Sequence, residues 1–265
     1  MRIQHSTPPN ALFRLLLVAC LVTGTLWAAT DPFVGKWKVN PSRSKLTDEM
    51  KVEVVGANRY AITFGPGAVD TIVADGTDQA ALQGTTLSIT ADGPNNWKVV
   101  RKKEGRMLVT GYWTLSGDGK TLNDDFTAYQ PDGSTIKLHY VYERTAGSSG
   151  FTGTWDSASA ELNSVMELEI QTYEGDGLSF KGPTAGLSQN IKFDGDDYAN
   201  PKAGAGYAFS GRRINERTLE ITDKFQGKTR ATRQVELSPD LKTLTMSMLG
   251  AGESKPKNIL VFDRE

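Results

Sequence analysis

The sequence is poor in the residues that build most metal sites and nucleophilic active sites. Cysteine occurs once, as Cys20, and histidine twice, as His5 and His139. Because Cys20 lies in an N-terminal apolar run, the rest of the chain has no disulfide, thiolate nucleophile or cysteine metal ligand. In a strand, His139 would point to the face opposite that of Tyr140 and Tyr142, and we expect it on the surface. The counts exclude a Cys-His pair and a multi-histidine zinc site, and we expect no catalytic residues, no metal and no cofactor.

The chain also has no excess of either charge, with 30 Lys and Arg residues against 31 Asp and Glu residues. Removing residues 1–29 takes away Arg2 and Arg14 and no acid, so 28 basic residues remain and the net charge is −3. This balance argues against binding to nucleic acid or anionic lipid. One predicted hairpin is locally basic, with Lys98, Arg101, Lys102, Lys103 and Arg106. We interpret it as a solvated face, and binding of an anionic partner is the alternative.

Long hydrophobic runs are missing after residue 29. Residues 1–29 have the layout of a secretory signal peptide, with Arg2 and Arg14 in a polar start, an apolar run over 15–26 and small residues near Ala28. The run is shorter than the roughly 20 residues that a membrane-spanning helix needs. We therefore expect a periplasmic or secreted protein without a transmembrane segment. Residues 17–20 also fit a lipoprotein cleavage box, so a lipid anchor on Cys20 is the less favoured alternative.

The remaining sequence contains two copies of one module. Residues 33–37 (FVGKW) return as 151–155 (FTGTW), an offset of 151 − 33 = 118, and 142–144 (YER) return as 262–264 (FDR), an offset of 262 − 142 = 120. Ordered recurrences at nearly constant offsets indicate an internal duplication. We predict a signal peptide at 1–29 and two barrel repeats at 31–146 and 150–265. A flexible Gly/Ser linker at 145–150 would join the repeats.

Each repeat has the hydrophobic pattern of β-strands with one buried face. Residues 166–170 (MELEI) alternate strictly, as do 50–54 (MKVEV), and no helical stripe appears after residue 29. Glycine-containing turns separate about eight short strands in each repeat. The pattern predicts an all-β protein with two tandem antiparallel up-and-down β-barrels of about eight strands each.

A tryptophan and an arginine mark the two ends of each repeat. Trp37 and Trp155 follow a Gly-x opening, whereas Arg144 and Arg264 lie in the last strand. First and last strands are neighbours in a closed barrel. We therefore predict that Arg144 covers Trp37 and that Arg264 covers Trp155, each cation–π contact contributing about 1 to 2 kcal/mol.

These residues resemble the calycin superfamily of lipocalins, fatty-acid-binding proteins and avidins, whose barrels share a Gly-x-Trp opening and an arginine packed over that tryptophan. The opening FVGKW followed by Asn40 and Ser44-Lys45 is also similar to exported bacterial lipocalin-like proteins of unknown function. The chain departs from lipocalins in having neither a helix after the last strand nor a disulfide. The resemblance implies a barrel that carries a small ligand.

Arg233 is the leading candidate for a ligand contact. Its strand places Ala231, Arg233 and Val235 on one face, which the first repeat fills with apolar residues, so Arg233 is predicted to point into the barrel. Fatty-acid-binding proteins use interior arginines to hold a carboxylate, and the resemblance implies a ligand site made of Arg233, Ala231, Val235 and Tyr207. The alternatives are that Arg233 pairs with an acid near the barrel mouth or that a bulge turns it outward.

Two acidic clusters favour simpler interpretations. Asp124 and Asp125 are neighbours in a strand and point to opposite faces, so they cannot share a substrate, and we interpret them as a bulge or rim feature. Residues 194–197 (DGDD) lack the further acid that an EF-hand needs, and a tight turn is favoured over a calcium site.

The sequence favours an exported, non-catalytic binding protein that holds a small amphipathic or apolar ligand in a lipocalin-like barrel. Arg233 makes the second repeat the favoured place. Three inward indoles in the first repeat, Trp37, Trp97 and Trp113, together with Val99, suggest a filled core there. The alternative is a structural or protein-interaction module of the cell envelope with filled barrels. The sequence does not indicate an oligomeric state.

Overall fold

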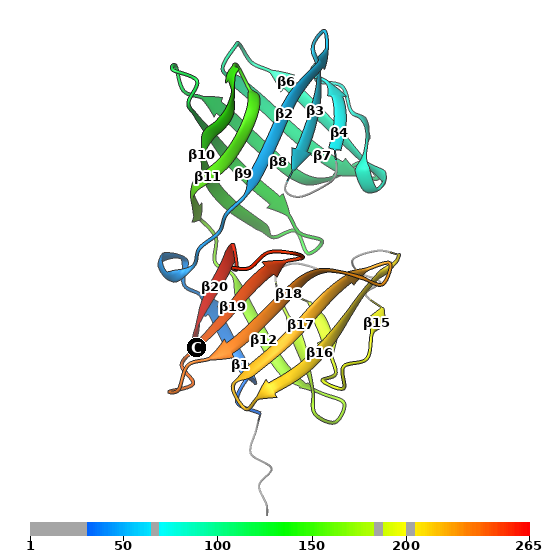
Figure 1. Ribbon diagram of the computed structural model, residues 1–265, viewed down its shortest axis with the longest axis vertical. Helices are drawn as coiled ribbons and strands as arrows, with labels where there is room; N and C mark the ends of the chain where they lie inside the picture. The colour runs from blue at the N-terminus through cyan, green and yellow to red at the C-terminus, as the bar shows by residue number, and fades with distance from the viewer. Residues whose placement is uncertain (1–30, 65–68, 183–187, 200–204) are drawn as a thin grey trace, which may run out of the picture. The chain divides into compact units, whose positions relative to one another are not determined.

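The computed structural model describes residues 31–64, 69–182, 188–199 and 205–265, and these form an all-β fold (Figure 1). Two antiparallel ten-stranded sheets contain all the strands of the described residues, which confirms the predicted fold class. Two short 3-10 turns, η1 (Pro41–Arg43) and η2 (Leu82–Gly84), complete the elements. None of the helices in the described part of the chain has the length and apolarity needed to cross a membrane. The predicted signal peptide and Cys20 lie outside the described residues.

The first sheet, called barrel 1, has the strand order β4-β3-β2-β11-β10-β9-β8-β7-β6-β5. Its strands are β2 (Glu49–Gly56), β3 (Arg59–Phe64), β4 (Val69–Val73), β5 (Gln79–Ala81), β6 (Thr85–Ala91), β7 (Asn96–Lys103), β8 (Arg106–Leu115), β9 (Thr121–Tyr129), β10 (Thr135–Ser149) and β11 (Thr152–Leu162).

The second sheet, called barrel 2, has the order β14-β13-β12-β1-β20-β19-β18-β17-β16-β15 and forms the more open half-barrel. Its strands are β1 (Gly35–Val39), β12 (Glu167–Tyr173), β13 (Gly177–Lys181), β14 (Gln189–Ile191), β15 (Tyr198–Ala199), β16 (Tyr207–Asn215), β17 (Thr218–Phe225), β18 (Lys228–Leu237), β19 (Thr243–Gly250) and β20 (Asn258–Arg264).

The opening strand of each sequence repeat lies in the sheet of the other repeat. β1 pairs with β12 and β20, so that Trp37 is opposite Leu168 on one side and Arg264 on the other. β11 pairs with β2 and β10, so that Trp155 is opposite Met50 and Arg144. Each sheet therefore draws strands from both repeats of the sequence.

The exchange overturns the predicted pairing of arginines with tryptophans. The guanidinium carbon of Arg264 lies 4.0 Å from the ring centroid of Trp37, and that of Arg144 lies 4.1 Å from the ring centroid of Trp155. An arginine of the last strand does cover an indole of an opening strand, but that strand comes from the other repeat. The prediction that Arg144 covers Trp37 and Arg264 covers Trp155 is wrong for this reason.

The predicted flexible linker at 145–150 is also wrong, and its structure explains the exchange. β10 continues to Ser149, and after a turn at Gly150 the chain returns as β11, with Ala146 opposite Thr154 and Ser149 opposite Thr152. A short turn between consecutive strands favours an antiparallel hairpin. The opening strand of the second repeat therefore pairs with the closing strand of the first.

The glycine of each Gly-x-Trp opening makes room for the covering arginine. A Cβ atom on Gly35 would lie 2.8 Å from Nη1 of Arg264, and one on Gly153 would lie 2.8 Å from Nη1 of Arg144. Both glycines also have positive φ angles, +149° and +154°, which side chains disfavour. Arg264 donates three hydrogen bonds to the carbonyls of Leu241, Val34 and Pro32.

A side chain bridges the two edge strands of barrel 1. The backbone N–H of Val73, at the end of β4, donates to Oε1 of Gln79 at 2.9 Å, and Nε2 of Gln79, in β5, donates to the Val73 carbonyl at 2.7 Å. The side-chain amide of Gln79 thus makes the two hydrogen bonds to Val73 that a neighbouring strand would make, and it bridges the gap between β4 and β5. Closure protects edge hydrogen-bonding groups that would otherwise be exposed.

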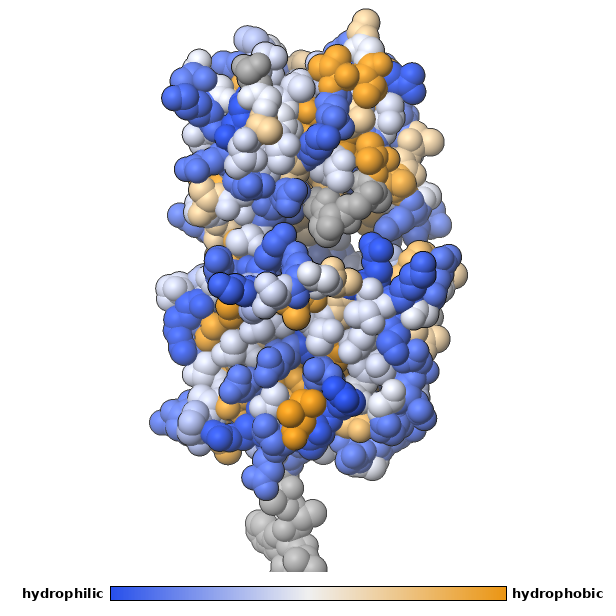
Figure 2. Space-filling model, in the orientation of Figure 1, coloured by the Kyte–Doolittle hydropathy of each residue, from blue (hydrophilic) through white to orange (hydrophobic). Residues whose placement is uncertain are grey.

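The inner faces of the strands form two apolar cores, whereas the face drawn in Figure 2 is largely hydrophilic. In barrel 1, Trp97 and Val99 point inward as predicted, and Trp97 stacks on Phe151 at 4.2 Å between centroids and on Trp113 at 6.0 Å. Trp37 was predicted in this core but belongs to the core of barrel 2, because β1 lies in that sheet.

Double-mutant cycles distinguish the exchanged pairing from pairing within each repeat. We expect Arg264→Met with Trp37→Leu, and Arg144→Met with Trp155→Leu, to show coupling free energies of roughly 1 to 2 kcal/mol in urea unfolding. The cross-cycle of Arg144→Met with Trp37→Leu serves as the control and should give a coupling near zero. Strong coupling in that control would contradict the exchange.

Candidate functional site

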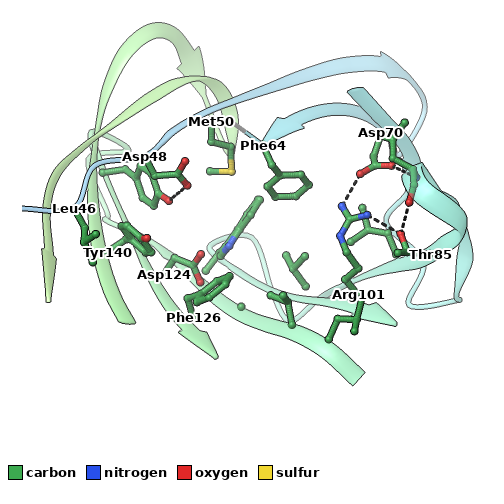
Figure 3. Close-up of a pocket in the computed structure, with 18 of the residues that line it drawn as sticks. Leu46, Asp48, Met50, Phe64, Asp70, Thr85, Arg101, Asp124, Phe126 and Tyr140 are labelled. Atoms are coloured by element: carbon green, nitrogen blue, oxygen red, sulfur yellow. Dashed lines mark hydrogen bonds and ion pairs between the residues drawn. The ribbon is translucent and has the colours of Figure 1, made fainter. Parts of the chain in front are cut away.

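A cavity of about 620 Å³ opens within barrel 1 (Figure 3). This volume falls within the range of about 300 to 1,000 Å³ that is typical of small-molecule pockets. The apolar side chains in its wall include one from each of six strands of barrel 1: Met50, Phe64, Leu87, Val99, Trp113 and Phe126. Polar side chains gather in two groups, which lie on opposite sides of the cavity in Figure 3.

The first polar group, called the arginine end, consists of Asp70, Thr85 and Arg101. Nη2 of Arg101 donates to Oδ2 of Asp70 at 2.5 Å, and Nη1 donates to the hydroxyl of Thr85 at 2.9 Å. Oδ1 of the buried Asp70 accepts the backbone N–H of Leu82 at 2.8 Å. Arg101 also lies over the ring of Phe64, at 5.5 Å from its centroid. An ion pair whose carboxylate is buried and that makes this many hydrogen bonds is held in place.

Arg101 was predicted to belong to a solvated basic hairpin, and this prediction is wrong. Arg101 lies two residues after Val99 and four after Trp97, so strand alternation puts its side chain on the same inward face, where it meets Asp70. Lys102 instead forms an ion pair with Asp78 on the outer side, and Lys98 lies over the ring of Tyr112.

The second polar group, called the acidic end, consists of Asp48, Asp124, Tyr140 and Tyr142. The hydroxyl of Tyr142 donates to Oδ2 of Asp48 at 2.8 Å. Asp124 is only 7 % exposed. Among the residues that the structure describes, its Oδ1 is the one buried side-chain oxygen or nitrogen without a hydrogen-bond partner. A Cβ atom on Gly111 would lie 2.8 Å from this oxygen, so glycine there leaves space for the carboxyl group.

Burial changes the acidity of the acidic end. Burial raises the pKa of Asp124 from 3.8 to about 7; the nearby indole of Trp113 opposes this rise, and the charge of Asp48 adds to it. Burial also raises the pKa of Asp48, although the hydrogen bond from Tyr142 opposes the effect. The pKa values of the Tyr140 and Tyr142 phenols are raised by burial and by both aspartates, so these hydroxyls stay protonated.

Asp124 and Asp125 point to opposite faces of β9, as predicted. The register of β9 with β8 and with β10 is continuous through both residues, so the interpretation as a bulge or rim feature is wrong. Asp124 lies inside the barrel, whereas the side chain of Asp125 is 72 % exposed and its Oδ1 lies 2.8 Å from Nδ1 of His139. The outward orientation predicted for His139 is confirmed.

Arg233 lies inside barrel 2, as its place in the strand predicts, and is 5 % exposed. Its Nε and Nη2 donate to the two carboxylate oxygens of Asp223, both at 2.8 Å, and Nη2 also donates to Oε1 of Gln189 at 2.8 Å. This is the acid partner that the sequence left open as an alternative to a ligand. Val235 is fully buried in the core, and Tyr207 packs on Phe225 at 4.7 Å between centroids. Ala231, opposite Asp223 in β17, is half-buried.

The acidic residues of the barrel 1 cavity were missed as a site because they are scattered along the chain. Strand alternation could have found two of them, since Asp124 is two residues from the buried Leu122 and Asp70 is two residues from the buried Ile72. Asp48 precedes β2, and no periodic pattern places it near β9.

The other acidic cluster forms a turn. The N–H of Asp196 donates to Oδ1 of Asp194 at 3.0 Å, and Gly195 has a φ of +86°, in line with the predicted tight turn. Within the described ranges, no group of three or more His, Cys, Asp or Glu side chains could hold a metal ion.

Comparisons with known proteins do not assign the chain to a family. No protein-family model matches the sequence, and no curated protein matches it. What the structure shows is an all-β chain with barrel-like sheets and two arginine-covered tryptophans.

The pH dependence of stability tests the burial of Asp124. The Asp124 carboxyl group binds its proton more tightly in the folded protein than in the unfolded chain. The free energy of unfolding therefore falls as the pH rises from 3.8 to about 7 and this proton is lost. Asp124→Asn has no proton to lose here. We therefore expect the free energy of unfolding of the variant, relative to that of the wild type, to be on the order of 2 to 4 kcal/mol higher at pH 8 than at pH 4. Urea unfolding at both pH values measures the difference. Asp125→Asn, on the outer face, is the matched control, and an equal gain in that variant would contradict the assignment.

Proposed function

We propose that this protein is a non-catalytic binding protein of the calycin type, which holds a small amphipathic or apolar molecule in the cavity of barrel 1. The observation that carries the proposal is the cavity of about 620 Å³ inside the barrel. Its wall is apolar and aromatic, and a few fixed polar groups lie at two ends. This is the usual composition of a small-molecule pocket.

The position of the cavity moves the proposed site from the second repeat to barrel 1. The sequence favours the second repeat because of Arg233, but that guanidinium is bound to Asp223 and Gln189. In the alignment of the repeats, Asp223 corresponds to Arg101 and Arg233 corresponds to Gly111 (223 − 101 = 122 and 233 − 111 = 122). Where barrel 2 has a large buried arginine, barrel 1 has a glycine, and the carboxyl group of Asp124 occupies the space beside it.

The proposed location is the periplasm or the outside of the cell. It is supported by the signal-like layout of residues 1–29 and by the lack of cysteine after Cys20. A molecule held inside a barrel is shielded from water, which suits the transport or storage of poorly soluble compounds.

Binding of octanol, a simple amphipathic probe, tests the proposal. Val109 lines the cavity of barrel 1, and Val109→Trp should fill it and weaken octanol binding by roughly tenfold or more. Ala231 is the aligned residue in barrel 2 (231 − 109 = 122), and Ala231→Trp provides the matched comparison. Calorimetric titration measures both affinities. A loss of binding confined to Ala231→Trp would place the ligand in barrel 2 and contradict the proposal.

Native mass spectrometry of protein purified from cells gives a second measurement. We expect an adduct of small-molecule mass on the wild type, and a depleted adduct on Val109→Trp. If the wild type carries no adduct and binds no octanol, the alternative of a structural or protein-interaction module is favoured.

A further inference from the structure

We propose that the molecule held in barrel 1 carries a positively charged N–H group, an ammonium or amidinium, which donates a hydrogen bond to Asp124. This inference rests on the proposed function and specifies the ligand class. It is carried by the geometry of the acidic end.

The first argument is the carboxyl group itself. Asp124 is 7 % exposed and lines the cavity, and its Oδ1 accepts no hydrogen bond from the described residues. A buried carboxylate oxygen without a donor costs free energy. A donor on a bound molecule would remove that cost, because the Asp124 side chain lines the cavity.

The second argument is the balance of charge around the cavity. The charged side chains in its wall are Asp48, Asp70, Asp124 and Arg101. Asp70 and Arg101 form an ion pair, so the acidic end contributes two carboxyl groups with no cation of the described wall beside them. A cationic ligand group would lower the repulsion between these carboxylates, whereas an anionic group would increase it.

The third argument is the aromatic surroundings of Asp124. Trp113 comes from β8, Phe126 from β9, and Tyr140 and Tyr142 from β10, and all four line the cavity. Figure 3 shows Phe126 and Tyr140 close beside Asp124. Aromatic faces attract cations, most strongly where water is excluded. Together with the unpartnered oxygen, they favour a cation that also has an N–H to donate.

Four octyl compounds separate the possible ligand chemistries: octylamine, octanol, octyltrimethylammonium and octanoate. They share one chain and differ in the head group, so differences in calorimetric affinity report on the polar end. We expect octylamine to bind about tenfold or more tightly than octanol, octyltrimethylammonium to fall between them, and octanoate to bind most weakly.

Asp124→Asn should bring octylamine to the affinity of octanol and leave octanol unchanged. Asp125→Asn is the matched control, because this neighbour lies on the outer face beside His139, and its octylamine affinity should equal that of the wild type. Asp48→Asn is a second variant, expected to weaken octylamine by a smaller factor. Thermal melts establish that each variant is folded.

Lowering the pH gives a further readout. The groups that face Asp124 are Asp48, Tyr140, Tyr142 and the indole of Trp113, with Asp125 and His139 behind it on the outer face. Because burial raises the pKa of Asp124 to about 7, octylamine affinity should fall as the pH drops below that value. Octanol affinity should not change over the same range.

The outcomes separate this inference from the proposed function. If octanol binds in barrel 1 but octylamine shows no advantage, the inference is overturned while the proposed function stands. Tighter binding of octanol than octylamine would indicate instead that a protonated Asp124 donates to a neutral ligand. If none of the four compounds binds, the proposed function itself is contradicted.

Discussion

The structure depends on the contact between a buried indole and the guanidinium that covers it. Trp37 and Trp155 are completely buried, and each indole N–H donates to a carbonyl four residues earlier. Arg264 and Arg144 lie over these rings and bind carbonyl groups of several segments. The contact therefore fixes the opening strand, the closing strand and the turns around them, and everything inside the barrels is arranged relative to it.

The two barrels use the same positions for different polar contacts. Barrel 2 places Arg233 where barrel 1 has Gly111, and it binds this arginine with Asp223, which aligns with Arg101. In barrel 1 the arginine is on the neighbouring strand and pairs with Asp70. The duplicated framework is thus retained, while the interior ion pair of each barrel is built from different positions.

The sequence predicts the duplication, the strand alternation and the inward orientation of Arg233, because each depends on local periodicity. It cannot predict the strand exchange, since Trp37 and Trp155 have the same local environment and either would fit under either arginine. The length of the connection between Arg144 and Trp155 decides the pairing. The cavity is equally hidden, because Asp48, Asp70 and Asp124 come to line one space only after the sheet has closed.

The exchanged position of β1 has a consequence for synthesis on the ribosome. Chains generally begin to fold from the end that emerges first. Here β1 needs a partner that is made 227 residues later, as Trp37 meets Arg264 (264 − 37 = 227). Barrel 1 can be completed once residue 162 has emerged, whereas β1 pairs first with β12 and gains its second partner, β20, only when residues 258–264 have been made. A premature stop before β20 would therefore leave one edge of β1 unpaired and the indole of Trp37 uncovered, although barrel 1 could still fold.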